Sequence, residues 1–380
     1  MKGKNNKSGG FLAGLILIII GVMVLWSNEG RAVKTQKAIK EAKENYIQIK
    51  SNTVDSKNDG KLVSTYGKVD LSSSEELLDS RFNIHMKAIK LVRYVEMYQW
   101  VEDCETDEDN TENCTYSKEW SDKLIDSTEF SKSGYNNPSS FQIENENFVA
   151  SNVKMGEFTL PSRLIEKISV DKTIGNEVLL NQYANSVSNY KVVDKYITNS
   201  LDSENPIVGD TRVSYKYASP DSVSVLAVQT DSTFEAYTAK SGNIVFEICK
   251  GEYTGNEILE KMAHSNKVMK WGLRALGFFL LYIGFAALFS PLQMLSQKIP
   301  VIRNIVSFSS NVISTVLSIS LSLLVIAIAW FRFRPIFSIS LFAVIVVLIV
   351  LLNLKKKDNI EEPKESLSKN IKEKNTDKKE

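Results

Sequence analysis

Four long runs of apolar residues constrain the fold of this chain more than any other feature. They cover residues 11–26, 271–295, 305–331 and 336–354. Runs of roughly 18 or more apolar residues are typical of membrane-spanning helices, and the first run, at about 16, suffices if its helix stands nearly upright. The sequence therefore predicts an integral membrane protein with four transmembrane helices and excludes a purely soluble chain.

Basic residues beside these runs predict the orientation of the chain. They precede the first run, separate the second from the third and follow the fourth: Lys2, Lys4, Lys7, Lys298, Arg303 and Lys355 to Lys357. Retained positive charge marks the cytoplasmic side. We therefore expect a cytoplasmic N-terminus at residues 1–10, an extracytoplasmic or luminal domain at 27–270 and a disordered, charged cytoplasmic tail at 355–380. Because no small-residue cleavage site follows the first run, it is interpreted as an uncleaved signal anchor.

Polar and aromatic residues at the predicted outer ends of the spans form a candidate membrane-interface site: Asn28, Glu29, Arg31, Trp271, Arg274, Trp330, Arg332 and Arg334. The charge rule does not favour arginine on that side, so these arginines need another explanation. In one interpretation they extend to lipid phosphates. In the other they form a cluster in which Glu29, the only carboxylate at this level, pairs with one arginine. The second interpretation predicts that Glu29→Arg destabilises the assembly and that a compensating Arg→Glu partly restores it.

Serine recurs every fourth residue in the third run, at Ser310, Ser314, Ser318 and Ser322. This spacing places the four side chains on one helix face. Small hydroxyl residues let helices approach closely and hydrogen-bond across the contact. The stripe is therefore interpreted as a packing surface, against another span or against a second copy, and a hydrophilic path for a substrate is the alternative. No Asp, Glu or His lies inside a span, which disfavours an ion pump.

The segment between the first two spans is long enough for one domain with its own core. Alternating and β-branched patterns predict strands, and turn residues separate them. The expected strands are 87–102, 115–120, 211–217, 222–229, 234–239 and 244–248; the expected helices are 31–50, 162–168 and one that begins at Thr254 with a capping box to Glu257. The fold class is thus a mixed α+β domain with a largely antiparallel sheet, inserted between helices 1 and 2.

Two cysteines, Cys104 and Cys114, flank an acidic segment at the ends of two predicted strands. This placement suits a disulfide in an oxidising compartment. The acidic segment lacks the glycine of a calcium loop, because Asp103 at position one would put Glu108 at position six. Three cysteines and two distant histidines also make a poor zinc set. We expect no metal and no cofactor.

Catalytic signatures are absent from the sequence: it contains no nucleophile elbow, P-loop, dinucleotide fingerprint or zinc-protease motif. An enzyme whose catalytic residues are brought together only by the fold, without a known motif, stays open.

The 46 Lys and Arg residues nearly balance the 45 Asp and Glu residues. We expect no nucleic-acid partner, because such a partner requires a basic, patterned surface.

Several ordered motifs resemble the LUMA family, transmembrane protein 43. They are Trp26-Ser27-Asn28-Glu29-Gly30-Arg31, Glu96-Met97-Tyr98-Gln99-Trp100, Tyr116-Ser117-Lys118-Glu119-Trp120, Asn137-Pro138-Ser139, Val208-Gly209-Asp210-Thr211-Arg212, Thr238-Ala239-Lys240-Ser241-Gly242, Trp271-Gly272-Leu273-Arg274 and Arg334-Pro335. The cysteine pair and the long charged tail depart from the family pattern, so the resemblance does not support the disulfide. The resemblance implies four spans, a large external domain and self-association, with no catalytic residue to transfer. Eukaryotic members reside in the endoplasmic reticulum and inner nuclear membrane, where they organise complexes with emerin and lamins.

Two hypotheses of function follow. The first is a non-enzymatic membrane organiser or scaffold that contacts membrane lipids, forms homo-oligomers through its helices and binds a membrane or envelope protein through its external domain. The second is a membrane-interface enzyme that acts on lipid or envelope substrates at Glu29 and the arginines. A transporter subunit ranks third. A Lys-, Asn- and Ile-rich composition suggests a bacterial source, for which the plasma membrane is the expected location; a eukaryotic source would imply the endoplasmic reticulum or inner nuclear membrane.

Overall fold

The chain divides into two compact units in this computed structural model. The described residues are 6–106, 112–183, 187, 189–296, 300–335 and 339–340. The first unit, here called the helix unit, comprises residues 1–34 and 266–380, and the second, the sheet unit, comprises residues 35–265. Apart from residues 339–340, the predicted fourth span and charged tail lie outside the described residues.

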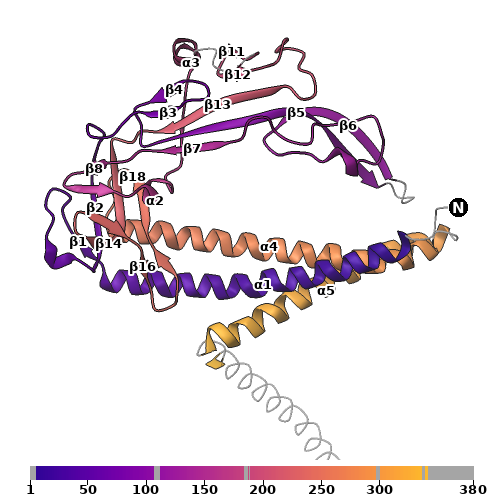
Figure 1. The fold of residues 1–380 in the computed structure, drawn as a ribbon. Helices are drawn as coiled ribbons and strands as arrows, with labels where there is room; N and C mark the ends of the chain where they lie inside the picture. The colour runs from indigo at the N-terminus through magenta and orange to yellow at the C-terminus, as the bar shows by residue number, and fades with distance from the viewer. Residues whose placement is uncertain are drawn as a thin grey trace, which may run out of the picture. The chain divides into compact units, whose positions relative to one another are not determined.

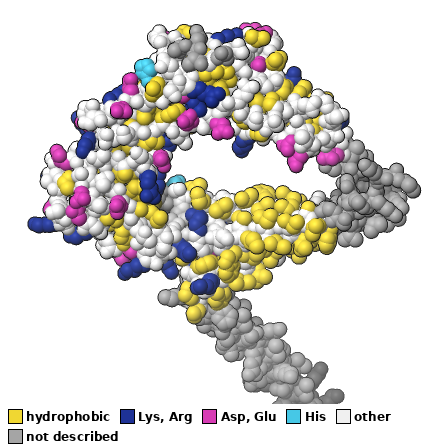
Figure 2. Space-filling model, viewed as in Figure 1, with side chains coloured by type: hydrophobic (Ala, Val, Ile, Leu, Met, Phe, Trp, Pro, Cys, Tyr) yellow, Lys and Arg dark blue, Asp and Glu magenta, His cyan; other side chains and the backbone are white. Residues whose placement is uncertain are grey.

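Three helices among the described residues are long and apolar enough to cross a membrane. They are α1 (Asn6–Asn45), α4 (Gly255–Ser296) and α5 (Pro300–Phe333) (Figure 1). The structure thus contains helices at the first three predicted spans. Figure 2 shows hydrophobic side chains gathered along these helices, with Lys and Arg side chains near one end of that surface.

Helix α1 is continuous where the sequence suggests a span at 11–26 followed by a separate helix at 31–50. Its 40 residues correspond to about 60 Å, roughly twice the hydrocarbon thickness of a bilayer. No proline interrupts the stretch between the two expected elements, so no backbone N–H is lost there and the helix can continue. Helix α4 likewise joins the helix expected at Thr254 to the second span.

Glycines bring α1 and α4 into close antiparallel contact within the helix unit. Gly14 faces Gly284. Gly21, seven residues later on α1, faces Gly277, seven residues earlier on α4. A Cβ added to Gly14 would lie 2.7 Å from the backbone oxygen of Gly284. Only a residue without a side chain allows two helices to approach so closely, as in other small-residue contacts in membranes. Leu25 and Leu281 are buried beside these glycines.

The serine stripe of α5 is buried within the chain. Ser314 and Ser318 have no exposed surface, and Ser310 and Ser322 are almost fully buried. Val325, which lies on the same face, packs with Leu25 of α1 and Leu281 of α4. The Ser318 hydroxyl donates to the Ser314 carbonyl of its own helix at 2.6 Å, rather than across a helix contact. The stripe is therefore occupied by contacts within one copy.

The sheet unit contains two large sheets among its described residues, and every strand pair in them is antiparallel except β1 with β2. The first sheet has the order β15-β14-β2-β8-β9, with β1 beside β2 and β18 beside β14. Its strands are β1 (Ile47–Gln48), β2 (Leu62–Asp70), β8 (Val153–Met155), β9 (Phe158–Leu160), β14 (Ser222–Thr230), β15 (Thr233–Glu235) and β18 (Glu247–Lys250).

The second sheet has the order β11-β12-β13-β5-β6, with β10 beside β13 and β7 beside β5. Its strands are β5 (Lys90–Thr106), β6 (Glu112–Ser121), β7 (Glu146–Val149), β10 (Lys172–Thr173), β11 (Lys191–Val193), β12 (Tyr196–Thr198) and β13 (Thr211–Ala218). The long strand β5 pairs with β13 through its first half and with β6 through its second half. The β5–β6 hairpin therefore extends beyond β13.

Short elements complete the sheet unit. They are the strand pairs β3 (Leu77–Asp79) with β4 (Ile84–Met86) and β16 (Tyr237–Thr238) with β17 (Ile244–Val245), the helices α2 (Ser162–Ile165) and α3 (Asn176–Gln182), and the 3₁₀ turns Ser56–Asn58 and Ser127–Glu129. The strand expected at 234–239 is divided between β15 and β16, and the strand expected at 244–248 between β17 and β18. The structure thus contains the predicted, largely antiparallel sheet domain.

A buried polar group crosses the core of the sheet unit, which is otherwise built from apolar residues such as Phe82, Phe158 and Leu91. Asp79 accepts hydrogen bonds from Arg93 and from the Tyr215 hydroxyl, both at 2.6 Å. Burial raises the pKa of Tyr215, and the charge of Asp79 raises it further. Arg93 also donates to the Glu144 carbonyl and to the Glu146 carboxylate, so the buried charges are paired and hydrogen-bonded. This group holds β3, β5 and β13 together.

Candidate functional site at the membrane interface

Glu29 is a carboxylate buried among the three helices of the helix unit. Its side chain is only 1% exposed. Arg274 of α4 donates from Nε to Glu29 Oε1 at 2.6 Å, and Trp330 of α5 donates from Nε1 to Glu29 Oε2 at 3.0 Å. Both carboxylate oxygens therefore accept a hydrogen bond, and the two donors belong to different helices. We call these three residues the Glu29 cluster.

Asn28 joins α1 to α4 beside the Glu29 cluster. Its amide nitrogen donates to the Lys270 carbonyl at 2.9 Å, and its oxygen accepts from Arg31 at 3.1 Å. Arg31 also donates to Asn266 of α4, whose own amide donates to the carbonyl of Ala32. Asn28 and Lys270 continue the seven-residue repeat of the glycine contacts, which is why they meet at this point.

Aromatic side chains surround the cluster. The rings of Trp26 and Phe333 lie 5.7 Å apart. Phe333 of α5 rests against Gly30, where an added Cβ would lie 2.7 Å from its ring. The Arg274 guanidinium also lies 4.7 Å from the centre of the Trp271 ring, a distance typical of a cation–π contact. Trp271 itself is 58% exposed.

The structure places the four predicted arginines in different surroundings. Arg274 forms an ion pair with Glu29, and Arg31 donates to Asn28 and Asn266. Arg332 is exposed. Arg334 is half-buried and lies close enough to Lys270 for their charges to interact. The structure thus brings together Asn28, Glu29, Arg31, Trp271, Arg274 and Trp330, and leaves Arg332 outside this set.

This arrangement is suited to holding helices together. A buried carboxylate whose two oxygens each accept an N–H hydrogen bond is held in place, and the charge-assisted bond from arginine favours its ionised form. Its removal would leave Arg274 as an unpaired buried charge, which is strongly unfavourable. The chemistry of the cluster is therefore that of an intramolecular clamp between α1, α4 and α5.

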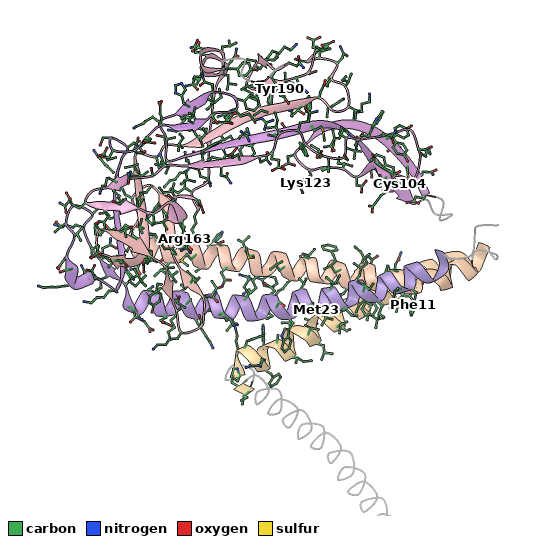
Figure 3. All side chains as sticks on the ribbon, in the orientation of Figure 1. Phe11, Met23, Cys104, Lys123, Arg163 and Tyr190 are labelled. Atoms are coloured by element: carbon green, nitrogen blue, oxygen red, sulfur yellow. A yellow bond between two sulfur atoms is a disulfide. The ribbon has the colours of Figure 1, made fainter. Side chains whose placement is uncertain are left out.

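A disulfide joins Cys104 and Cys114, which lie opposite each other on β5 and β6. Figure 3 labels Cys104 near the end of this hairpin. Glu102 lies close to both sulfurs, but bonded cysteines offer no thiolate to a metal. Hydrogen bonds from the Tyr116 hydroxyl and from the Ser131 backbone N–H lower the pKa of Glu102. Residues 107–111, which include Asp107, Glu108 and Asp109, lie outside the described residues.

A small pocket of about 200 Å³ lies on the sheet unit beside Arg212. The Arg212 guanidinium is held between the rings of Trp120 and Tyr196, 4.5 Å from the centre of each. It also forms a bidentate ion pair with Glu96. Because this arginine is already paired with Glu96, it offers no excess charge to an anion. Sequence reasoning did not identify this group.

The sequence carried signals for some of the residues that it did not identify. The seven-residue spacing between Gly14 and Gly21, repeated between Gly277 and Gly284, could have indicated the α1–α4 contact. By contrast, no local pattern connects Asp79 and Arg93 with Tyr215, because Tyr215 lies 136 residues after Asp79.

The comparisons with known proteins agree on one family. The model of the family described as transmembrane protein 43 matches residues 97–335. The chain is 30% identical over 353 residues to transmembrane protein 43 of Rattus norvegicus, covering 88% of this chain and 87% of the rat protein. It is also 30% identical to the Homo sapiens protein over 354 residues, and 27% identical to the Drosophila melanogaster homologue over 350 residues, with 88% and 86% of this chain covered and 87% and 89% of those proteins. No solved structure matches the chain.

Proposed function

Because this chain belongs to the transmembrane protein 43 family, we propose that it is a non-enzymatic membrane organiser. In this proposal the helices anchor the protein and associate with a second copy, and the sheet unit binds a membrane or envelope protein. The observation that carries the proposal is the closed Glu29 cluster. Glu29 accepts hydrogen bonds at both carboxylate oxygens from Arg274 of α4 and Trp330 of α5. A carboxylate held in this way between helices of one chain is expected of a scaffold.

Self-association requires a surface other than the serine stripe, because the stripe is buried within one copy. The outward face of α5 is apolar and exposed at Leu323 and Leu324, which are 63% and 55% accessible. In a bilayer such a face contacts either lipid or another helix. We propose the second copy as its occupant, in place of the serine contact that the sequence suggested.

We also propose that the sheet unit faces an oxidising, extracytoplasmic compartment and that both termini are cytoplasmic. Two independent features support this orientation. The Cys104–Cys114 disulfide is typical of the lumen, periplasm or cell exterior. The lysines that precede the first span and follow the fourth favour the cytoplasm.

Photo-crosslinking in the protein's own membrane tests the organiser proposal. A photo-reactive residue at Leu323 should crosslink to a second copy, and one at Ser318, which is fully buried in the same helix, should give no crosslink between copies. Comparing the crosslinks formed at Leu323 and at Ser318 distinguishes a contact between copies at the surface of α5 from non-specific capture. Lipid adducts alone at Leu323 would contradict self-association through α5.

A membrane-interface enzyme at the Glu29 cluster is the weaker proposal. It would require Glu29 to act as a base, yet the side chain is only 1% exposed and each oxygen already accepts a hydrogen bond, from Arg274 or from Trp330. We expect Glu29→Gln to leave the lipid composition of the membrane unchanged. A folded Glu29→Gln protein that accumulated one lipid or envelope precursor would instead favour the enzyme.

A further inference from the structure

The second sheet presents a half-exposed face that is rich in aromatic and polar side chains. Along β5, the even-numbered residues from 94 to 100 are half-buried, whereas the odd-numbered residues between them are buried. The strand register places Glu96 of β5 opposite Arg212 of β13, and Tyr98 of β5 opposite Trp120 of β6. Residues that lie opposite each other in a sheet share one face. Three neighbouring strands therefore supply the aromatic and charged side chains of this face.

The pocket of about 200 Å³ beside Arg212 opens on this face. Trp120 and Tyr196 form part of its wall, and Asp194 and Ser203 add a carboxylate and a hydroxyl group. Asp194 lies in the turn between β11 and β12 and has a φ of 51°, which an aspartate tolerates better than most residues do. Sites for drug-sized ligands have volumes of roughly 300–1,000 Å³, so this smaller pocket suits a single ring.

Three polar groups in the pocket can bond to a ligand. Arg212 donates to Glu96 from Nε and Nη2, so Nη1 has no acceptor among the described residues. The Asp194 carboxylate and the Ser203 hydroxyl likewise form no hydrogen bond within the described part of the chain, and both residues are exposed. A guanidinium nitrogen donates, a carboxylate accepts and a hydroxyl does both. The pocket therefore offers donors and acceptors together.

Charge and ring contacts restrict the class of ligand. The ion pair with a glutamate neutralises Arg212, and Asp194 adds a negative charge, so a phosphate or carboxylate would be repelled. Arg212 lies 4.5 Å from the centres of the Trp120 and Tyr196 rings and so already occupies the position between them that a cationic ligand would take. Lys195, 5.5 Å from the centre of the Tyr196 ring, would repel a second cation. The class that remains is a neutral ligand with several hydroxyl groups.

We propose that this pocket binds one sugar unit of a neutral oligosaccharide. A sugar ring presents C–H groups that can pack against Trp120 and Tyr196, and hydroxyl groups that can bond to the polar side chains. Arg212 Nη1 would donate to one hydroxyl oxygen, and the Asp194 carboxylate would accept from another hydroxyl, both as charge-assisted bonds. Aromatic walls with a few placed polar groups are typical of small-ligand sites. The site needs neither a second copy nor a protein partner, so it is independent of the organiser proposal.

Saturation-transfer NMR of the full-length protein tests the inference. The protein is placed in phosphatidylcholine nanodiscs, because many common detergents carry a sugar headgroup that would compete. The probes are neutral oligosaccharides of glucose, mannose, galactose or N-acetylglucosamine, and the same backbones with uronic acid units. We expect at least one neutral oligosaccharide to bind, and its acidic counterpart to bind more weakly.

Two matched variants locate the binding. Asp194→Asn should weaken the affinity roughly tenfold, because a charge-assisted hydrogen bond becomes a neutral one, and asparagine tolerates the same backbone conformation. Asp231→Asn is the control, since Asp231 is also exposed, lies in a turn between two strands of the same unit and has the same φ of 51°; it should leave the affinity unchanged. Melting temperatures of both variants confirm that they fold.

Three results would overturn the proposal. They are the absence of binding by every neutral oligosaccharide, tighter binding of the acidic counterparts, and equal affinities in Asp194→Asn and Asp231→Asn. None of them would alter the crosslinking result at Leu323, so the carbohydrate site and the organiser proposal can fail separately.

Discussion

Glu29 shows how far a single residue can be interpreted from sequence. It is the only carboxylate at the predicted outer ends of the apolar runs, and a lone buried charge is too costly to persist without a partner. The sequence therefore predicts a pairing with an arginine. It does not single out Arg274, because the choice among four arginines depends on the register between α1 and α4. The hydrogen bond from Trp330 was not predicted for the same reason.

Replacing Glu29 tests this residue. Glu29→Gln should lower stability by about 3 kcal/mol, because it leaves the largely buried Arg274 without a counter-charge. Thermal unfolding in detergent measures the loss. The charge exchange Glu29→Arg with Arg274→Glu should recover part of what Glu29→Arg alone loses. Arg332→Glu, which changes an exposed charge, provides the control and should not rescue. If Arg274→Glu does not rescue Glu29→Arg, or if Arg332→Glu rescues it equally well, the clamp is wrong.

Glu102 gives the hairpin a dependence on pH. Because hydrogen bonds lower its folded pKa, the unfolded chain binds its proton more readily, with a carboxyl pKa of about 4.3. The stabilisation is thus fully present above that value and is lost as the pH falls through the folded pKa. We expect the melting temperature of the wild type to fall more steeply below about pH 4.3 than that of Glu102→Gln. Parallel curves would contradict this account.

At the scale of elements, helix type was easier to predict than helix extent. The apolar runs located α1, α4 and α5, but their polar continuations were assigned as separate or adjoining helices. The structure has one helix across residues 6–45, because nothing in the sequence between the two segments stops it. Strand β2 was not predicted; its first four residues are all buried, so it lacks the alternation that reveals a half-exposed strand.

The glycine contacts predict a contrast between two substitutions in the same helix pair. Gly14→Ala should destabilise the helix unit by about 1–3 kcal/mol, because its Cβ would meet the Gly284 backbone oxygen, which cannot rotate away. Gly272→Ala is the matched control, since nothing lies within 4 Å of its added Cβ. Melting temperatures of the two variants in detergent measure the contrast. Equal stability of both would argue against close α1–α4 packing.

At the scale of the whole molecule, the charge distribution and the disulfide together predict orientation. The expected fourth span and the tail lie outside the described residues, so orientation depends on the lysines and on Cys104–Cys114. The external partner could not be predicted, because the sequence of the sheet unit contains no known partner-binding motif. Charged groups such as Glu96 and Arg212 are also paired with each other.

Cysteine labelling tests the orientation. In a Cys249→Ser background, Ser232→Cys, which lies in an exposed turn, should react with a membrane-impermeant maleimide added to intact cells or sealed vesicles of the native orientation. Lys357→Cys should react only after the membrane is opened. The native disulfide does not interfere, because bonded cysteines do not react. Labelling of Lys357→Cys before Ser232→Cys would reverse the proposed orientation.

Native mass spectrometry of the protein, extracted together with its surrounding lipid, tests the organiser most directly. The method reports copies of the chain, other proteins and lipids in one spectrum. We predict a homo-oligomer or a second protein at fixed stoichiometry, and Glu29→Gln should lower its abundance by loosening the helices. A strictly monomeric chain without a protein partner, in extracts from its own membrane, would contradict the proposal that this protein organises others.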